Sequence, residues 1–272
     1  MATRLWFSIP PPPRVTGLPP GGERFVVSVG SSAVRGMSYG QGPVAYLVHG
    51  WGGLGAQLGS FIEPLRSKGF RVVVFDAPAH GESDPGPSGP GRSHGLEFSR
   101  ALEAVAVRFG PAHSVIAHSM GAVPALLAQI QGRLTTGQLV FLAPMRDLAS
   151  HFDRFAGQLG IGQRVRAQMT VQTERLVDYP VAGVDVRVLS GLLPPLPLLV
   201  VHDRGDRETR HEDSVQLVDN WKGPARLVST DGLGHRRILS DPGVVDEVVG
   251  FVLRAPTRPS ATSSPAVSAP AG

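Results

Sequence analysis

The chain has 272 residues, enough for one large α/β domain or two small ones, and we favour one. It contains no cysteine, which excludes disulfides, thiolate metal sites and a cysteine nucleophile. The formal charge is only +4, and the basic residues are scattered among 22 acidic ones, which argues against a nucleic-acid partner. The sequence shows no secretory leader and no apolar stretch long enough for a membrane span. We therefore expect a soluble, cytoplasmic protein with no membrane partner, although a lack of cysteine also suits a secreted one.

Proline-rich segments flank the expected domain. Residues 1–22 include the run Pro10–Pro13, which can form neither a helix nor a sheet ladder, so this segment is expected to be an extended lead-in. Residues 255–272 consist largely of proline, serine, alanine and threonine and are expected to be disordered. The folded domain is therefore expected at residues 23–254.

Between these ends, apolar runs of strand length alternate with longer helical patterns. Helices are expected at residues 96–109, 120–131 and 244–253. Strands are expected at residues 24–29, 44–48, 70–75, 114–117, 138–142, 196–201 and 225–229. Such alternation is typical of βαβ units, so we expect an α/β fold with a mostly parallel sheet covered by helices on both faces.

The segment from about residue 145 to 193 interrupts this alternation because it contains no convincing core strand. Leu148, Phe152, Phe155 and Leu159 recur at helical spacing, which predicts amphipathic helix here. We interpret the segment as a small helical cap over the carboxyl edge of the sheet, where ligands bind in this fold class. The alternative is an ordinary crossover helix with a long loop, but the segment is longer than a normal crossover.

The run from Ser114 to Ala122 passes from an apolar strand through small residues into an apolar helix, which is typical of a nucleophile elbow with Ser119 at its corner. The small residues two before and two after the serine are Ala117 and Gly121, where glycine is usual at both. The alternative is a buried turn serine that caps the next helix.

A serine nucleophile needs a base, an acid that orients the base, and donors for the oxyanion. The candidate base is His235, which lies on a glycine-rich loop after the last expected strand. His118 is adjacent to Ser119 in sequence, but neighbours at a sharp turn point apart, so we expect it to line the pocket or pack. Three aspartates that follow strands are candidate acids.

Among these three we favour Asp206, deep in the loop after residues 196–201, where its carboxylate can turn toward His235. Asp203 leaves the strand almost directly and is expected to organise the turn through local hydrogen bonds. Asp147, after the preceding strand, remains a third option.

The expected oxyanion donors are the backbone amides of Met120, directly after the serine, and Trp51, in the glycine-rich loop 49–53. The Trp51 indole would wall an acyl pocket or simply pack in the core. This loop does not space its glycines as a dinucleotide motif requires, and no phosphate-loop lysine follows. We therefore expect no cofactor, and no metal enters the expected mechanism.

Five motifs occur in a fixed order: residues 49–53, 76–83, 117–121, 202–206 and 232–235. With them the chain resembles the α/β-hydrolase superfamily over residues 23–253, and in particular its esterase-like, cofactor-free members. The resemblance implies an eight-stranded, mostly parallel sheet, a helical cap, and a triad of Ser119, Asp206 and His235. It also implies that Asp76 and His80 stabilise a turn.

Two alanines depart from the family pattern, because glycine is usual at Ala79 and Ala117. Alanine tolerates most of what such turns require unless φ is positive, so we expect mild adjustment at both positions.

The favoured function is hydrolysis of a small carboxylic ester through an acyl-enzyme. Trp51, His118, Phe152 and Phe155 are candidate pocket residues and suggest an apolar acyl or aromatic group, although a cap helix needs the same apolar stripe to stay folded. A C–C bond hydrolase, an acyltransferase or a perhydrolase would use the same triad. A non-catalytic binding protein on this scaffold would require a broken triad.

Overall fold

The computed structural model describes residues 2–12, 14 and 17–254, so the tail expected at 255–272 lies outside the described residues. One eight-stranded sheet runs through the molecule in the order β1-β2-β4-β3-β5-β6-β7-β8. Its strands are β1 (Glu23–Val29), β2 (Ser32–Tyr39), β3 (Val44–Val48), β4 (Arg71–Phe75), β5 (Ala112–His118), β6 (Thr136–Leu142), β7 (Leu198–Asp203) and β8 (Ala225–Thr230). Strand β2 pairs antiparallel with both of its neighbours, and the other pairs are parallel. The expected mostly parallel α/β sheet is confirmed.

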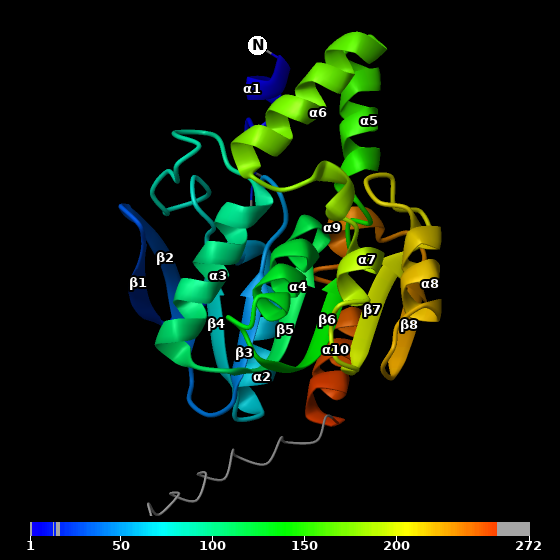
Figure 1. The fold of residues 1–272 in the computed structure, drawn as a ribbon. Coiled ribbons are helices and arrows are strands. Elements are labelled where there is room, and N and C mark those ends of the chain that lie inside the picture. The colour runs from blue at the N-terminus through cyan, green and yellow to red at the C-terminus, as the bar shows by residue number, and fades with distance from the viewer. Residues whose placement is uncertain (1, 13, 15–16, 255–272) are drawn as a thin grey trace, which may run out of the picture.

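Helices cover both faces of the sheet (Figure 1). They are α1 (Ala2–Trp6), α2 (Ile62–Ser67), α3 (Gly95–Phe109), α4 (Ala122–Ile130), α5 (Leu148–Gln158), α6 (Gln163–Val177), α7 (Val186–Ser190), α8 (His211–Asp219), α9 (Gly234–Arg237) and α10 (Pro242–Arg254), with 3₁₀ turns η1 (Gly55–Phe61), η2 (Ser119–Gly121) and η3 (Val181–Gly183). One core contains side chains of α3, α4, α7 and α8, and the other contains those of η1, α2 and α10. No helix in the described part of the chain has the length and apolar character needed to cross a membrane.

The central strands are apolar throughout because both of their faces are buried. All five residues of β3 are buried, and in β4 Val73 faces one core while Val72 and Val74 face the other. A strand alternates its side chains between the two faces, so a sheet covered on both sides needs apolar residues at every position.

Strand β2 was not expected from the sequence, because it includes Ser32, Arg35 and Gly36 and does not form an apolar run. Its partner strands decide its position: a Cβ at Gly36 would lie only 2.3 Å from the Val74 carbonyl oxygen. Tertiary pairing therefore places a strand that local hydrophobicity does not mark.

The expectation of a wholly extended lead-in at residues 1–22 is wrong for its first part, because Ala2–Trp6 form helix α1. The prolines that prevent a helix begin only at Pro10, so the residues before them are able to form one. Trp6 packs edge-on against Phe152 and Phe155 of α5, which holds the short helix on the cap.

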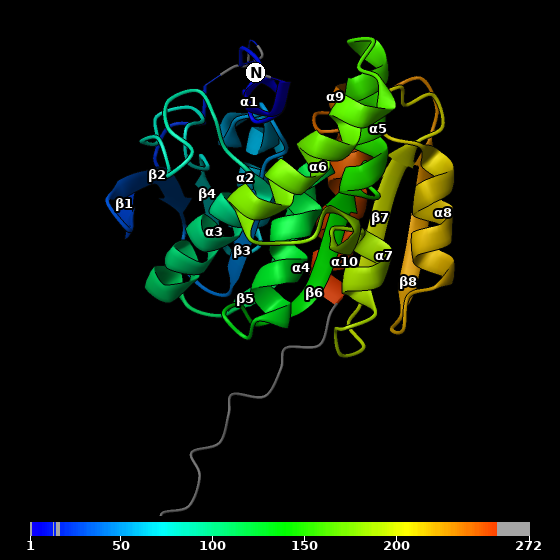
Figure 2. The ribbon, with the colours of Figure 1, turned by 45° about the horizontal axis from the view of Figure 1, so that its top comes forward.

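Helices α5 and α6 stand above the carboxyl edge of the sheet, where a cap was expected (Figures 1 and 2). The side chain of Asp147 begins α5, since it accepts hydrogen bonds from the Ser150 backbone amide and hydroxyl. The cap does not fill the whole interval 145–193, because α7 packs beside α4 in the body of the domain: Val186 and Leu189 are buried in the core that contains α4.

Candidate active site

Ser119 occupies the corner between β5 and α4 with a backbone φ of +52°, in the left-handed region that non-glycine residues rarely adopt. The surrounding backbone leaves little freedom here. A Cβ at Gly121 would lie 2.7 Å from the His49 carbonyl oxygen, and one at Gly50 would lie 2.9 Å from the Ser119 Cβ. The close approach of the loop after β3 therefore holds this corner in place.

The two alanines that replace usual glycines behave differently. Ala117 is fully buried in β5 and pairs regularly with Val48 and Phe141. It is not among the residues with positive φ, so alanine needs no more than the mild adjustment expected there. Ala79 has a φ of +63°, which is the exception foreseen for alanine, and the expectation of mild adjustment is wrong there. The turn geometry around Ala79 is decided by its neighbours and not by its own preference.

Asp206 and His235 are brought together from the loops after β7 and β8. The Nδ1 of His235 lies 2.7 Å from Oδ2 of Asp206, and both side chains are almost fully buried. The amides of Glu208 and Thr209 donate to Oδ1 of the same aspartate at 2.7 and 3.0 Å. Burial raises the pKa of Asp206, but hydrogen bonds from His202 and His235 outweigh it and lower the pKa well below its usual range, so the carboxyl is anionic at neutral pH.

Two further residues complete this group and were missed in the sequence. His202 Nε2 lies 3.3 Å from Oδ2 of Asp206, and its Nδ1 lies 2.6 Å from the Ser214 hydroxyl. The hydroxyl of Thr209 donates to the same Asp206 oxygen at 3.0 Å. The signal for His202 was a histidine beside Asp203 at the end of the buried strand β7, whose other residues are apolar. Thr209 had no signal beyond its position three residues after Asp206 in the sequence.

The other two candidate acids accept hydrogen bonds from groups other than the His235 ring. Asp203 accepts from the Gly205 amide, the Thr230 hydroxyl and the Leu233 amide, so it ties the β7 turn to the loop that carries His235. Asp147 caps α5, as described above. Of the three, Asp206 is the one whose carboxylate accepts a hydrogen bond from Nδ1 of His235, which also lies 3.3 Å from the Thr209 hydroxyl oxygen.

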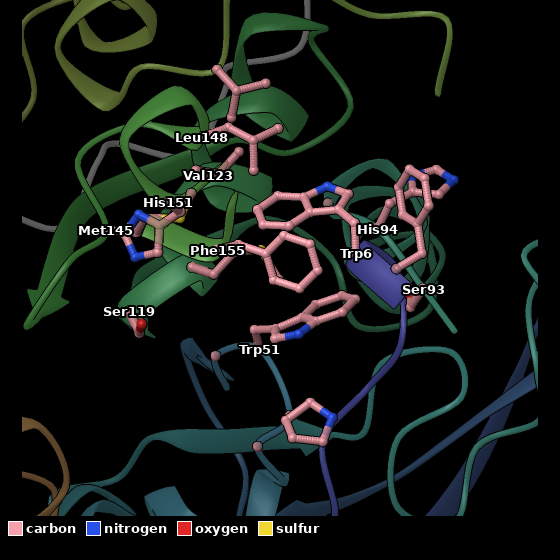
Figure 3. Close-up of a pocket in the computed structure, with 18 of the residues that line it drawn as sticks. Trp6, Trp51, Ser93, His94, Ser119, Val123, Met145, Leu148, His151 and Phe155 are labelled. Atoms are coloured by element: carbon pink, nitrogen blue, oxygen red, sulfur yellow. The ribbon is translucent and has the colours of Figure 1, made fainter. Parts of the chain in front are cut away.

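A cavity of about 440 Å³ lies between the carboxyl edge of the sheet and the cap. Ser119 and His235 both line it, together with three of the candidate pocket residues, Trp51, His118 and Phe155. Figure 3 shows the rings of Trp51, Phe155 and Trp6 gathered on one side of Ser119. Apolar side chains make up most of the cavity wall, as in ligand pockets generally, and the charged residues Arg154, Glu208 and Arg236 also line it.

Phe152 was expected to line this cavity and does not. It is buried against Trp6, with the ring centroids 4.8 Å apart, and it is absent from the lining. Phe152 and Phe155 lie three residues apart on α5, so they share one broad apolar face, but the packing of α1 divides that face between core and cavity.

The two expected oxyanion donors, the amides of Trp51 and Met120, belong to residues that line the cavity. Met120 is in the first turn of η2, where backbone amides have no partner within the helix. Trp51 is the second residue of the turn that the Gly53 amide closes by donating to the Gly50 carbonyl, and the Trp51 amide has no acceptor among the described residues. The indole of Trp51 both lines the cavity and stacks on Phe98, which unites the two roles considered for it.

His118 lines the cavity but differs from His235 in its hydrogen bonding. Its Nε2 donates to the His235 backbone carbonyl at 3.0 Å, and burial lowers its pKa to about 3. The ring is therefore neutral and braces the loop of His235, in line with the expectation that it lines the pocket or packs.

The turn after β4 is organised as the resemblance implied. Asp76 accepts from the Gly55 and Glu82 amides at 2.8 and 3.1 Å, and His80 accepts from the Gly52 amide at 3.2 Å. Through the Gly52 and Gly55 amides, these side chains fix the glycine-rich loop that contains Trp51 and the residues that follow it. Within the described ranges, no group of three or more His, Asp or Glu side chains is arranged to hold a metal ion.

Comparison with known proteins agrees with this architecture. A model of the Alpha/beta hydrolase family matches residues 45–248. No curated protein matches the sequence. Solved structures with the same fold include Est1E from Butyrivibrio proteoclasticus with ferulic acid bound, at 18% identity and a TM-score of 0.66 over 85% of this chain and 98% of that one. A putative lipase from Acinetobacter baumannii AYE is 20% identical, with a TM-score of 0.65 over 86% of this chain and 92% of that one.

Proposed function

Because this chain belongs to the alpha/beta hydrolase family, we propose that it is a serine hydrolase that cleaves a carboxylic ester through an acyl-enzyme. One observation carries the proposal: a serine at a left-handed corner and a histidine paired with a buried aspartate line the same cavity. The putative lipase that shares the fold supports the choice of ester. The catalytic residues in this proposal are Ser119, His235 and Asp206.

In the first half-reaction, the Ser119 oxygen attacks the ester carbonyl carbon while Nε2 of His235 takes the hydroxyl proton. The carbonyl oxygen becomes an oxyanion that accepts hydrogen bonds from the Trp51 and Met120 amides. The ester C–O bond then breaks, and His235 gives its proton to the departing alcohol oxygen. The anionic Asp206 holds Nδ1–H and stabilises the imidazolium that forms between these steps.

In the second half-reaction, water replaces the alcohol. Nε2 of His235 takes a proton from the water, whose oxygen attacks the acyl carbon, and the bond to Ser119 breaks as the serine regains a proton. An alcohol or peroxide in place of this water would make the protein an acyltransferase or a perhydrolase. Measuring whether either acceptor outcompetes water separates these activities from hydrolysis.

The test is the substitution Ser119→Ala. The wild-type protein should hydrolyse short p-nitrophenyl esters and be labelled by a fluorophosphonate, and the variant should lose both, with turnover falling by about 10³-fold or more because the nucleophile is gone. Release of p-nitrophenol and in-gel fluorescence are the measurements.

A matched control is Ser93→Ala, which removes another serine hydroxyl from the lining of the same cavity, where it donates to Glu97. This variant should remain labelled. Unimpaired hydrolysis after Ser119→Ala, or equal loss of labelling in both variants, would contradict the proposal.

A further inference from the structure

The N-terminal segment forms one wall of the cavity although it lies outside the part matched by the family, residues 45–248. We call residues 2–11 the strap. The strap residues that line the cavity are Leu5, Trp6, Phe7, Ser8, Pro10 and Pro11. The proposed catalytic steps use none of these residues.

The first half of the strap is attached to the cap. Trp6 meets Phe152 and Phe155 of α5 edge-on, with ring centroids 4.8 and 5.2 Å apart. The hydroxyl of Thr3 donates to the side chain of Gln172 on α6. Aromatic pairs in this geometry add to the stabilisation from buried area alone, so α1 is held against both cap helices.

The second half of the strap is attached to the body of the domain. Its backbone pairs with the loop before α3: the Ile9 amide donates to Gly91 at 2.9 Å, and the Ser93 amide donates to Phe7 at 3.2 Å. Pro10 lies directly on the oxyanion loop, since a Cβ at Gly52 would come within 2.4 Å of its Cγ. The strap therefore connects the cap with the loop that carries the Trp51 amide.

Three aromatic residues, Trp6, Phe155 and Trp51, line the cavity where the strap crosses it. Figure 3 shows Phe155 between Trp6 of the strap and Trp51 of the oxyanion loop, on one side of Ser119. In the proposed reaction the Trp51 amide holds the carbonyl oxygen, so a group on the carbonyl carbon that extends toward the cap meets this row of rings. Only the acyl group stays attached to Ser119 through both half-reactions and can use that wall throughout.

We propose that the strap is a substrate-binding element and that Trp6 determines specificity for an acyl group that carries an aromatic ring. The inference rests on the proposed ester hydrolysis. An aryl ring can stack on or meet the edges of Trp6 and Phe155, whereas an acetyl group has no ring to pair with them. The cavity of about 440 Å³ is large enough for such an acyl group.

The experiment compares two esters with the same leaving group, p-nitrophenyl 3-phenylpropanoate and p-nitrophenyl acetate. The ratio of their kcat/KM values isolates the acyl side. Trp6→Ala should lower this ratio about tenfold, since the aryl group loses an aromatic partner and the acetyl group loses nothing. Trp6→Phe keeps a ring and should stay within about threefold of wild type. Trp6→Leu keeps apolar volume without a ring and should lower the ratio even if the alanine variant does not fold.

The control is Trp221→Ala, because Trp221 donates to the Leu196 carbonyl and does not line the cavity. Its ratio should equal that of wild type. An unchanged ratio in both Trp6→Ala and Trp6→Leu, or an equal fall in the control, would overturn the proposal.

A binding measurement separates this proposal from the proposed chemistry. In the Ser119→Ala protein, titration calorimetry with 3-phenylpropanoate should show about tenfold weaker binding when Trp6→Ala is added. If the wild-type protein hydrolysed no ester and this weakening were seen, the proposed function would fall and the strap would stand. Unchanged binding would remove the strap as a binding element.

Discussion

At the scale of single residues, Ser119 and Ala79 share an unfavourable backbone conformation but differ in what it achieves. Ser119, at φ +52°, projects into the cavity, so its strain accompanies a placed hydroxyl. Ala79, at φ +63°, only shapes a turn whose amide donates to the Asp84 carbonyl. At this φ the methyl group of Ala79 adds steric strain to the turn.

We therefore expect Ala79→Gly to raise the free energy of unfolding by about 1 kcal/mol, because glycine adopts positive φ without the steric cost of a Cβ. Urea unfolding followed by circular dichroism measures the change. Ala117→Gly is the control: Ala117 lies in β5 and is fully buried, so its replacement should destabilise by about 1 kcal/mol. The same sign for both substitutions would count against this account.

At the scale of elements, the corner from β5 through η2 to α4 was readable from the sequence, and so were β3, β4, β6 and β7. Small residues around Ser119 and continuous apolar runs are local signals. Strand β2 and helix α1 were not readable, because the position of each depends on partners distant in sequence. Their limits follow from pairing with β1 and β4, and from packing of Trp6 on the cap.

The corner also explains which of its flanking positions needs glycine. Gly121 faces the end of β3, whereas Ala117 has room for its methyl group within the sheet. Gly121→Ala should lower the free energy of unfolding by about 2 kcal/mol, since its Cβ would meet the Val48 and His49 carbonyl oxygens at 2.8 and 2.7 Å. It should also slow fluorophosphonate labelling of Ser119, which shares that corner.

Gly250→Ala in α10 is the matched control, because the nearest atom to its new Cβ is the end of the Arg254 side chain at 3.5 Å. Alanine favours helix, so this variant should be as stable as wild type or slightly more so. Denaturation and labelling rates of the two variants give the comparison, and equal stability of both would refute the steric argument.

At the scale of the whole molecule, two buried histidines, His49 and His80, connect the loop after β3 with the loop after β4, and their hydrogen bonds require both rings to be neutral. His80 donates from Nδ1 to the Pro78 carbonyl and accepts the Gly52 amide at Nε2; His49 donates to the Gly50 carbonyl and accepts the Ala77 amide. A second proton on either ring would face an N–H donor. Burial lowers the pKa of both, and that of His80 to about 3.

Stability should therefore fall as the pH drops below about 6.5, where a histidine in the unfolded chain takes up a proton that the buried ring refuses. Because the unfolded state binds more protons in this range, each such histidine reduces the free energy of unfolding by about 1.4 kcal/mol per pH unit. For His80 the loss continues down to about pH 3. Above pH 7 both rings are neutral in both states and contribute no pH dependence.

Urea unfolding between pH 5 and pH 7.5 measures this slope. His80→Asn removes one titrating ring and should flatten the slope by about 1.4 kcal/mol per pH unit, whatever it does to stability at neutral pH. Asp206 acts at lower pH: its pKa is lowered on folding, so its stabilisation is present above the unfolded value near 3.9 and is lost only below it. A slope unaffected by His80→Asn would contradict the role of the buried ring.

The sequence by itself determined the α/β alternation, the serine corner and the order of serine, aspartate and histidine along the chain, because these depend on local apolar runs and turn residues. Only the tertiary structure decided that Asp206 meets His235, that Phe152 turns from the cavity to Trp6, and that the strap closes one wall. It also decided the positive φ of Ala79. Each of these results from contacts between segments far apart in the chain, which compete with local preference and prevail through packing.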